Sequence, residues 1–396
     1  MAGRRRASNS SVMAVCLLLA SLTACGGPSA ADTAKAEVQR VLDRRAAAVL
    51  DHDPAAYAAT GTRAPYANLW AVPLTAWSYR LKSLRRSGDT AVAHAELRYR
   101  VTGYDKAPVT AGRTLTLSTG ADGKWYVDSD RPEKKSAEQL WDQGTVSVVH
   151  GRRGLVLGVG HGDAVLRGYA DLADRAIPAV SDAWGTDWSR RVVLLVPKTL
   201  EGMAGLLGSP ASNYRGIAAV TTGETGGAGR TPADRIIVNP AAYGMLGSLG
   251  KQVVLTHETT HVATRAHTNA ATPLWLSEGY ADWVGYRGTG RTPDEAAPEL
   301  RRAVADGDVP AALPSDADFG FAGGPARLAR AYESGWMACR MIADHWGEQR
   351  LDDFYRSVGA HDSRAGAVED ALREVLGTTL ERFTEQWRAY LRGQLG

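Results

Sequence analysis

The chain has 396 residues, of which 44% are hydrophobic and 22% are charged, and its formal net charge at pH 7 is +3. This length is sufficient for two or three domains. The excess charge comes from the three arginines of residues 4–6, and the net charge without residues 1–24 is about 0. No basic stripe remains, which argues against a nucleic-acid partner.

The first 24 residues are expected to be a targeting segment rather than folded structure. Residues 4–6 provide a positive start, and residues 12–22 form an apolar run that is too short to span a membrane. Residues 22–25, Leu-Thr-Ala-Cys, then resemble the lipobox of bacterial lipoproteins. An ordinary signal peptide cut near Ala24 is the alternative.

The lipobox resemblance implies that Cys25 is lipidated and that the protein lies outside the cytoplasm, anchored to the cell membrane. Residues 25–32 would then be a flexible tether. Cys16 is lost with the signal peptide, so Cys339 is left without a partner for an intramolecular disulfide. The usage of Ala, Gly and Arg over Lys is typical of a high-GC bacterium, such as an actinobacterium.

Residues 33–131 are predicted to form a first α+β domain. An apolar stripe at helical spacing predicts one long helix over residues 33–59. Residues 120–123, Gly-Ala-Asp-Gly, indicate a hairpin between the last two strands. A helix on a curved antiparallel sheet resembles the nuclear-transport-factor-2-like cone fold. His52 and His94 are expected to be surface or packing residues. The expected strands are 77–84, 90–102, 113–118 and 124–128.

Residues 132–138 are expected to be a charged linker to a second domain, which covers residues 140–396. Its first part, residues 140–290, is predicted to contain a mixed sheet and a helix over 163–184 with Pro178 inside it. The expected strands are 145–149, 154–159, 192–196, 217–222 and 235–238, with a Gly-rich loop at 223–229. Either 217–222 or 235–239 could be an edge strand that pairs with a peptide, and both strands could instead be internal.

The sequence His257-Glu258-Thr259-Thr260-His261 supplies two imidazoles and a carboxylate. On a helix, His257 and His261 share a face and can bind one metal ion together. Glu258 lies about 100° around the helix from His257, so it points beside the ion and suits a general base. This combination is typical of a zinc site that activates water.

A second helix is predicted to begin at Thr272 as its N-cap, with Pro273 at the first helical position, and to run to about Val284. Glu278 lies in this helix as a candidate third ligand. Asp282 lies one turn further on the same face, where a carboxylate can accept the free ring N–H of a metal-bound histidine.

These residues resemble the gluzincin metallopeptidases, in which His-Glu-x-x-His and a glutamate on the next helix hold one zinc ion. The segment from Trp275 to Trp283 is most similar to the peptidase MA-like proteins of actinobacteria, although the spacer of 16 residues before Glu278 is shorter than in thermolysin-like enzymes. The resemblance implies that His257, His261 and Glu278 bind Zn²⁺ and that Glu258 is the base. It also implies a cleft between the sheet and a helical half, residues 291–396.

Two other interpretations of the motif stay open. The histidines could be core residues, with Glu258 and Glu278 in surface ion pairs. Alternatively, the zinc site could be structural, which usually requires a fourth protein ligand such as cysteine. Cys339 is far away in the sequence, which favours a fourth position that is open to water.

The tetrahedral intermediate needs a donor for its oxyanion besides the metal, and the resemblance implies that this donor is a tyrosine or histidine of the helical half. Tyr332 is the first candidate, although it could be a core tyrosine, and His345 is the second. Tyr280 lies about 200° around its helix from Glu278 and should point away from the metal. Residues 287–324 are expected to be partly helical and to border the cleft. The remaining helices are expected at 326–346, 351–358, 364–376 and 380–391.

The sequence therefore predicts a lipid-anchored extracytoplasmic zinc metallopeptidase that acts on a peptide or protein. One alternative is an inactive envelope lipoprotein that uses the cone-like domain to bind a partner. Another is a zinc enzyme that hydrolyses a different amide, such as one in cell-wall material.

Overall fold

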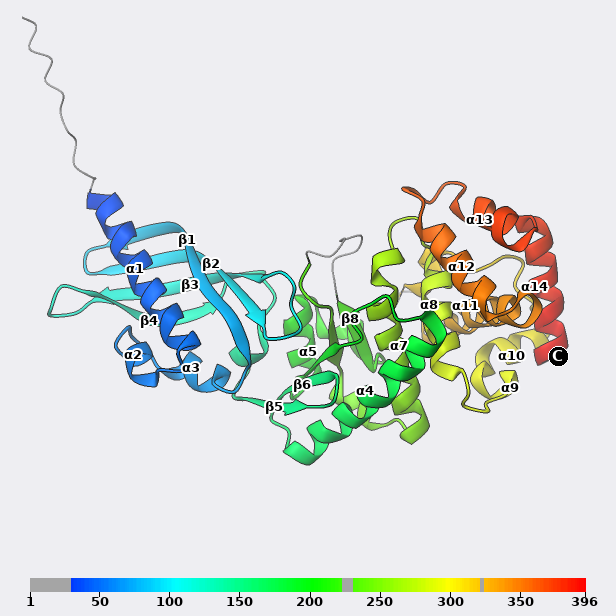
Figure 1. Cartoon of the computed structure of the whole chain (residues 1–396), viewed down its shortest axis with the longest axis horizontal. Helices are drawn as coiled ribbons and strands as arrows, with labels where there is room; N and C mark the ends of the chain where they lie inside the picture. Colours follow the sequence, from blue (N-terminus) through cyan, green and yellow to red (C-terminus); the bar gives the residue numbers. More distant parts are fainter. Residues whose placement is uncertain (1–29, 223–230, 321–323) are drawn as a thin grey trace, which may run out of the picture.

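A computed structural model describes residues 30–222, 231–320 and 324–396. The predicted signal peptide, Cys25, residues 25–29 of the tether and the Gly-rich loop lie outside the described residues. The fold is α+β, and its three parts follow one another along the long axis: an antiparallel sheet, a mixed sheet and a helical half (Figure 1). Within the described ranges, no helix is both long and apolar enough to cross a membrane.

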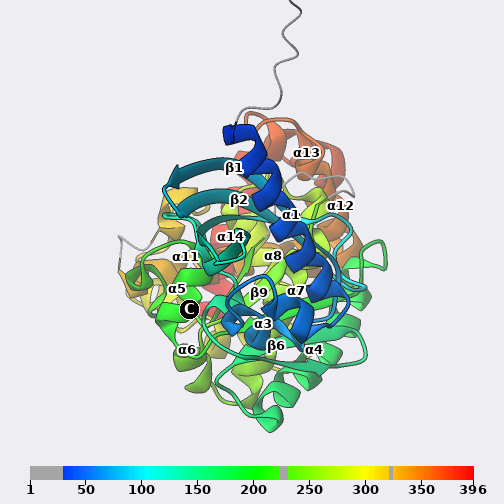
Figure 2. The same ribbon diagram turned by 90° about the vertical axis from the view of Figure 1, so that its left-hand side faces the viewer.

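The first part is a four-stranded antiparallel sheet with the strand order β1-β2-β3-β4. Helix α1 (Ala30–Leu50) lies across one face of this sheet (Figure 2). The predicted hairpin is confirmed, because Gly120 donates its N–H to the carbonyl oxygen of Lys124 at 2.9 Å. The strands are β1 (Leu74–Ser87), β2 (Thr90–Val101), β3 (Val109–Thr119) and β4 (Trp125–Pro132).

The prediction of one helix over residues 33–59 is wrong at both ends. Helix α1 begins three residues earlier and ends at Leu50, and two short helices follow, α2 (Pro54–Ala58) and α3 (Ala64–Leu69). The break has a local cause. Pro54 cannot continue a helix, and the Asp53 carboxylate instead caps a new one by accepting the N–H groups of residues 55 and 56.

The segment predicted as a linker is held at both of its ends: Glu133 donates its N–H to the Gly112 carbonyl oxygen of β3 at 2.9 Å, and Glu138 contacts the helix over residues 200–207. Arg113 of β3 is buried and pairs with Asp130 at 2.7 Å and with Asp142, beyond the segment, at 2.9 Å. Glu138 donates its N–H to the carbonyl oxygen of Gly205. A single hydrophobic cluster contains side chains from both sheets, so the first two parts share a core. Its members include Tyr99, Leu115, Trp141, Leu155, Val193 and Ile237.

The second sheet has the strand order β5-β6-β7-β9-β8. Strands β6, β7 and β9 are parallel, whereas β5 and β8 are antiparallel edge strands. Of the two strands predicted as a possible edge, β8 is therefore at the edge and β9 is internal. The strands are β5 (Val146–His150), β6 (Gly154–Val159), β7 (Val192–Val196), β8 (Ala219–Thr222) and β9 (Arg235–Val238).

Helices cover this sheet on both faces. Helix α4 (Asp163–Trp184) contains Pro178, as predicted, and packs with α7 (Ser248–Thr264) on one face. Helix α5 (Leu200–Leu207) packs with the shared core on the other. The short helix α6 (Pro240–Gly244) precedes α7.

Helix α8 (Leu274–Tyr286) begins one residue later than predicted, since Pro273 was expected at its first helical position. Pro273 occupies the N-cap position, and the Leu274 N–H finds its acceptor in the Asp316 carboxylate at 2.9 Å. Proline has no side-chain acceptor for the free N–H groups at the helix start, so a carboxylate from a segment distant in the sequence accepts one of them.

The helical half packs around one core together with α8. The stretch over 287–324 is partly helical, as predicted. The helices are α9 (Pro293–Ala296), α10 (Pro298–Ala305), α11 (Pro325–Trp346), α12 (Glu348–Gly359), α13 (Ala367–Leu376) and α14 (Leu380–Leu395).

Glycines allow α8 to lie unusually close to both neighbouring helices. A Cβ on Gly279 would lie 2.3 Å from the backbone of Gly335 in α11, and one on Gly285 would lie 3.2 Å from the carbonyl oxygen of Val253 in α7. Only glycine permits the 2.3 Å approach at Gly279, and the 3.2 Å approach at Gly285 is tight, so these positions bring α8 close to both α11 and α7 around one site.

Candidate metal centre

His257 and His261 of α7 and Glu278 of α8 converge on one point. The Nε2 atoms of the two histidines are 3.0 Å apart, and Glu278 Oε2 lies 3.2 Å and 3.4 Å from them. Tetrahedral zinc with bonds of about 2.0–2.1 Å separates its ligand atoms by about 3.3 Å. The three atoms therefore fit a zinc ion. Within the described residues, this is the only such group of three His, Cys, Asp or Glu side chains.

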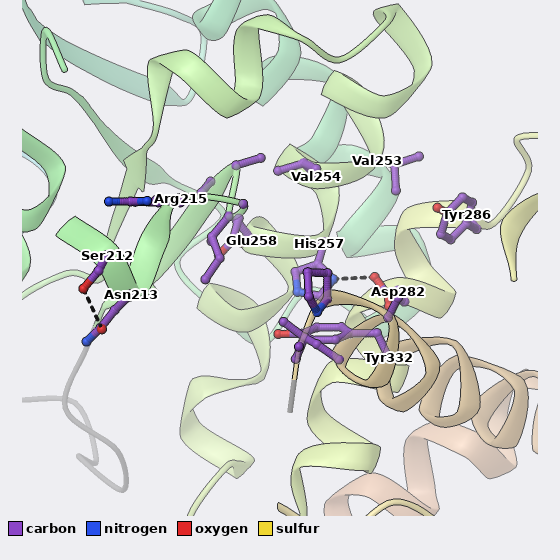
Figure 3. A pocket seen from close by; sticks show the side chains of 18 residues that line it. Ser212, Asn213, Arg215, Val253, Val254, His257, Glu258, Asp282, Tyr286 and Tyr332 are labelled. Carbon is purple, nitrogen blue, oxygen red and sulfur yellow. Dashed lines mark hydrogen bonds and ion pairs between the residues drawn. The ribbon is translucent and has the colours of Figure 1, made fainter. Parts of the chain in front are cut away.

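Asp282 lies beside the first histidine. Its Oδ1 atom is 2.7 Å from His257 Nδ1, so Nδ1 donates its proton to the carboxylate and Nε2 is the ring atom that faces the other two candidate ligands (Figure 3). Burial disfavours the charged imidazole, but Asp282 and Glu278 outweigh burial and raise the pKa of His257 well above its ordinary value. The site is therefore strongly favourable to positive charge.

Glu278 is stabilised in its charged form. Burial alone would raise its pKa, but the charge of His261 and hydrogen bonds from both histidines lower the pKa of Glu278 far below its ordinary value. An ionised carboxylate is the form that binds a metal.

Glu258 is buried, with 6% of its surface exposed. Its carboxylate accepts a hydrogen bond of 2.6 Å from the Thr221 hydroxyl of the edge strand β8. The same hydroxyl lies 3.0 Å from the Glu258 carbonyl oxygen. Thr221 was not predicted as a site residue, because nothing in the sequence relates it to a motif that lies 37 positions away.

Tyr332 of α11 reaches the site. Its ring centroid lies 6.4 Å from that of His257, and it packs on Phe319. Burial and then the negative charge of Glu278 raise the pKa of the Tyr332 phenol well above its ordinary value. The phenol is therefore protonated at neutral pH and can donate a hydrogen bond.

The other candidate donor, His345, is not at the site. It is exposed at the end of α11, and its ring packs edge-on against Tyr390 of α14. Tyr280 points away from the site, as predicted, and donates to Asp352 in the helical core. His52 and His94 are surface and packing residues, as predicted: the first is exposed beside Trp70 and the second lies beside Glu133.

A cavity of about 540 Å³ opens beside this cluster (Figure 3). Its walls come from the segment before β8, from α7 and α8, and from the start of α11. Most of the lining is apolar, and the candidate base, the first histidine and the candidate donor all border it. The lining includes Ile217, Val253, Val254, His257, Glu258 and Tyr332.

The arrangement disagrees with the two other interpretations of the motif. Glu258 and Glu278 are not in surface ion pairs, because the first is buried and the second contacts both histidines. Cys339 is fully buried, and its Sγ contacts the Leu276 carbonyl oxygen in the helical core. Among the described side chains, none supplies a fourth ligand.

No protein-family profile and no curated protein matches the chain. Among solved structures, an M1 zinc metallopeptidase from Deinococcus radiodurans matches with 14% identity and a TM-score of 0.33, over 81% of this chain and 60% of that one. A mutant of an M1 zinc metallopeptidase from the same organism, bound to a Tyr-Ser-Ala substrate, matches with 14% identity and a TM-score of 0.32, over 80% and 62%. The chain thus spans about 60% of the length of these structures.

Proposed function

We propose that this protein is a zinc metallopeptidase of the gluzincin type, similar to the peptidase MA-like proteins. The observation that carries the proposal is the triangle of ligand atoms from His257, His261 and Glu278, with edges of 3.0, 3.2 and 3.4 Å. The neighbouring carboxylate of Glu258 and the orienting carboxylate of Asp282 support a catalytic rather than a structural ion.

The chemistry follows from the positions of the side chains. A zinc ion held by these three residues would polarise a water molecule and lower its pKa toward ~7. Glu258 accepts a proton from the attacking water and passes it to the leaving amine. The Tyr332 hydroxyl donates a hydrogen bond to the oxyanion that develops on the substrate carbonyl.

The edge strand β8 is the part of the sheet that suits a peptide substrate. It pairs with β9 on one side only, and it carries Thr221 against Glu258. An extended peptide that adds to this edge through main-chain hydrogen bonds would place its scissile bond beside the base. Its side chain would then enter the largely apolar cavity between Val254 and Leu328.

The proposed setting is outside the cytoplasm, with Cys25 lipidated and residues 25–29 linking the membrane to α1. The substrate would then be a peptide or protein of the cell envelope or its surroundings. We also propose that the first part, a sheet with α1 on one face, has a nuclear-transport-factor-2-like fold.

The deciding experiment compares the wild-type protein with Glu258→Gln and with the control Glu374→Gln, which changes an exposed glutamate of α13. Zinc content and hydrolysis of a peptide library are measured for each. The first variant should keep one zinc per chain and lose hydrolysis, and the control should keep both. Full turnover by Glu258→Gln would refute the mechanism, and a wild-type protein without zinc would favour an inactive envelope lipoprotein. Zinc binding with turnover of only a non-peptide amide would reassign the substrate.

A further inference from the structure

The loop between β2 and β3, residues 102–108, reaches from the first sheet to the second. Its Asp105 side chain is fully buried and accepts two hydrogen bonds from Arg235 Nη2, at 2.8 and 2.9 Å. The same carboxylate accepts the N–H of Ala233 at 2.9 Å and that of Val101 at 2.7 Å. One carboxylate therefore joins the end of β2 to the start of β9.

Among the strands of the described residues, only β9 pairs with β8. Arg235 is paired in register with Thr222, and the Thr222 hydroxyl donates to the Arg235 carbonyl oxygen at 3.4 Å. The next pair joins Ile236 to Thr221. Because β8 has four residues and one neighbour, its position depends on where β9 begins.

The last contact of the series reaches the proposed base. Thr221 donates to the Glu258 carboxylate at 2.6 Å, so a shift of β8 would change the direction of that carboxylate. Three contacts connect Asp105 to Glu258: the buried Asp105–Arg235 ion pair, the pairing of β9 with β8, and the hydrogen bond from the Thr221 hydroxyl. Each contact has a defined geometry, and a general base must be held within a fraction of an ångström of its working position.

We propose that Asp105 is a positioning residue for the reaction, and that the first sheet is a part of the catalytic apparatus rather than a spacer. This inference rests on the proposed function for its kinetic consequence. Its structural consequence, that Asp105 holds the edge strand in place, does not depend on activity.

The first test is hydrogen exchange of backbone amides in the full-length protein. Asp105→Asn weakens the clamp on Arg235, so peptides that cover 217–222 should exchange faster, while those that cover the other edge strand, β5, should not change. Arg235→Lys keeps the positive charge but loses the planar guanidinium group and its hydrogen-bond geometry. This variant replaces Asp105→Asn in the test if Asp105→Asn does not fold. Unchanged exchange over 217–222 in a folded variant would overturn the inference, whether or not the protein is a peptidase.

The second test is kinetic and uses Asp142→Asn as the matched control, because Asp142 also pairs with a buried arginine between the sheets but does not touch β8 or β9. Asp105→Asn should keep its zinc and lose ~10- to 100-fold in kcat, and the control should keep wild-type kcat. In a Thr221→Val background, Asp105→Asn should cause little further loss, since both act on the same contact. Equal kcat for Asp105→Asn and the control, or fully multiplicative losses, would refute the role.

Discussion

Replacement of Asp282 tests how the proposed zinc site would hold its ion. Asp282 Oδ1 lies 2.7 Å from His257 Nδ1, and both side chains are mostly buried, so water cannot replace this contact easily. Asp282→Asn keeps an acceptor but removes the charge, whereas Asp282→Ala removes both. Loss of such a partner weakens metal binding by 10- to 100-fold, which is about 1.4 to 2.7 kcal/mol. We expect the asparagine variant at the lower end and the alanine variant at the upper end.

The assay is competition for zinc between the protein and a chelator of known affinity. Asp316→Asn is the control, because Asp316 caps the start of the same helix α8 without touching the histidines. The control should bind zinc as the wild type does. Equal zinc affinity for Asp282→Ala and the wild type would show that His257 is oriented without this carboxylate, and it would refute the role of Asp282 in zinc binding.

Two further predictions concern the helical half. Tyr332→Phe should lower kcat by about 10²- to 10³-fold at nearly constant KM, since the hydroxyl acts on the transition state. Steady-state kinetics measure this effect, and an unchanged kcat would show that Tyr332 has no role in the mechanism. Burial raises the pKa of the Glu333 carboxyl from 4.5 to about 7. The folded state therefore binds more protons between these values, and stability should fall as pH rises from 4.5 to 7, on the order of 1 kcal/mol after solvent screening. Urea unfolding of the metal-free protein should show this fall in the free energy of unfolding with pH, and Glu333→Gln should lack it. An equal fall in the variant would assign the pH dependence to another group.

The parts of the site that lie within one or two helical turns could be predicted from the sequence. The four-residue spacing of His257 and His261, and that of Glu278 and Asp282, follows directly from the geometry of a helix. The same geometry separates the two donor candidates. His345 is 13 residues beyond Tyr332 on α11, which is about 220° around the helix, so both could not face one site. The helix break at Asp53-Pro54 also had a readable local signal, an N-cap residue followed by proline.

The contacts between distant segments could not be predicted. Thr221 meets Glu258 only because β8 is the edge strand, and strand order depends on the whole sheet rather than on the four residues of β8. Gly279 and Gly335 likewise read as ordinary helix glycines, which weaken a helix by about 1 kcal/mol relative to alanine. Their benefit is visible only when the two helices cross, because a Cβ at either position would overlap the other backbone.

The site lies where the separate parts of the molecule meet, and this location has a physical consequence. The mixed sheet contributes the edge strand beside Glu258, helices α7 and α8 contribute the candidate ligands, and α11 contributes Tyr332. The shared core and the Asp105–Arg235 pair extend this dependence to the first sheet. A rigid constellation needs support from packed elements on every side. Local loosening of any one part should therefore disturb the geometry of the proposed base or donor before it weakens zinc binding at the proposed site, because all three candidate ligands lie on only two tightly packed helices.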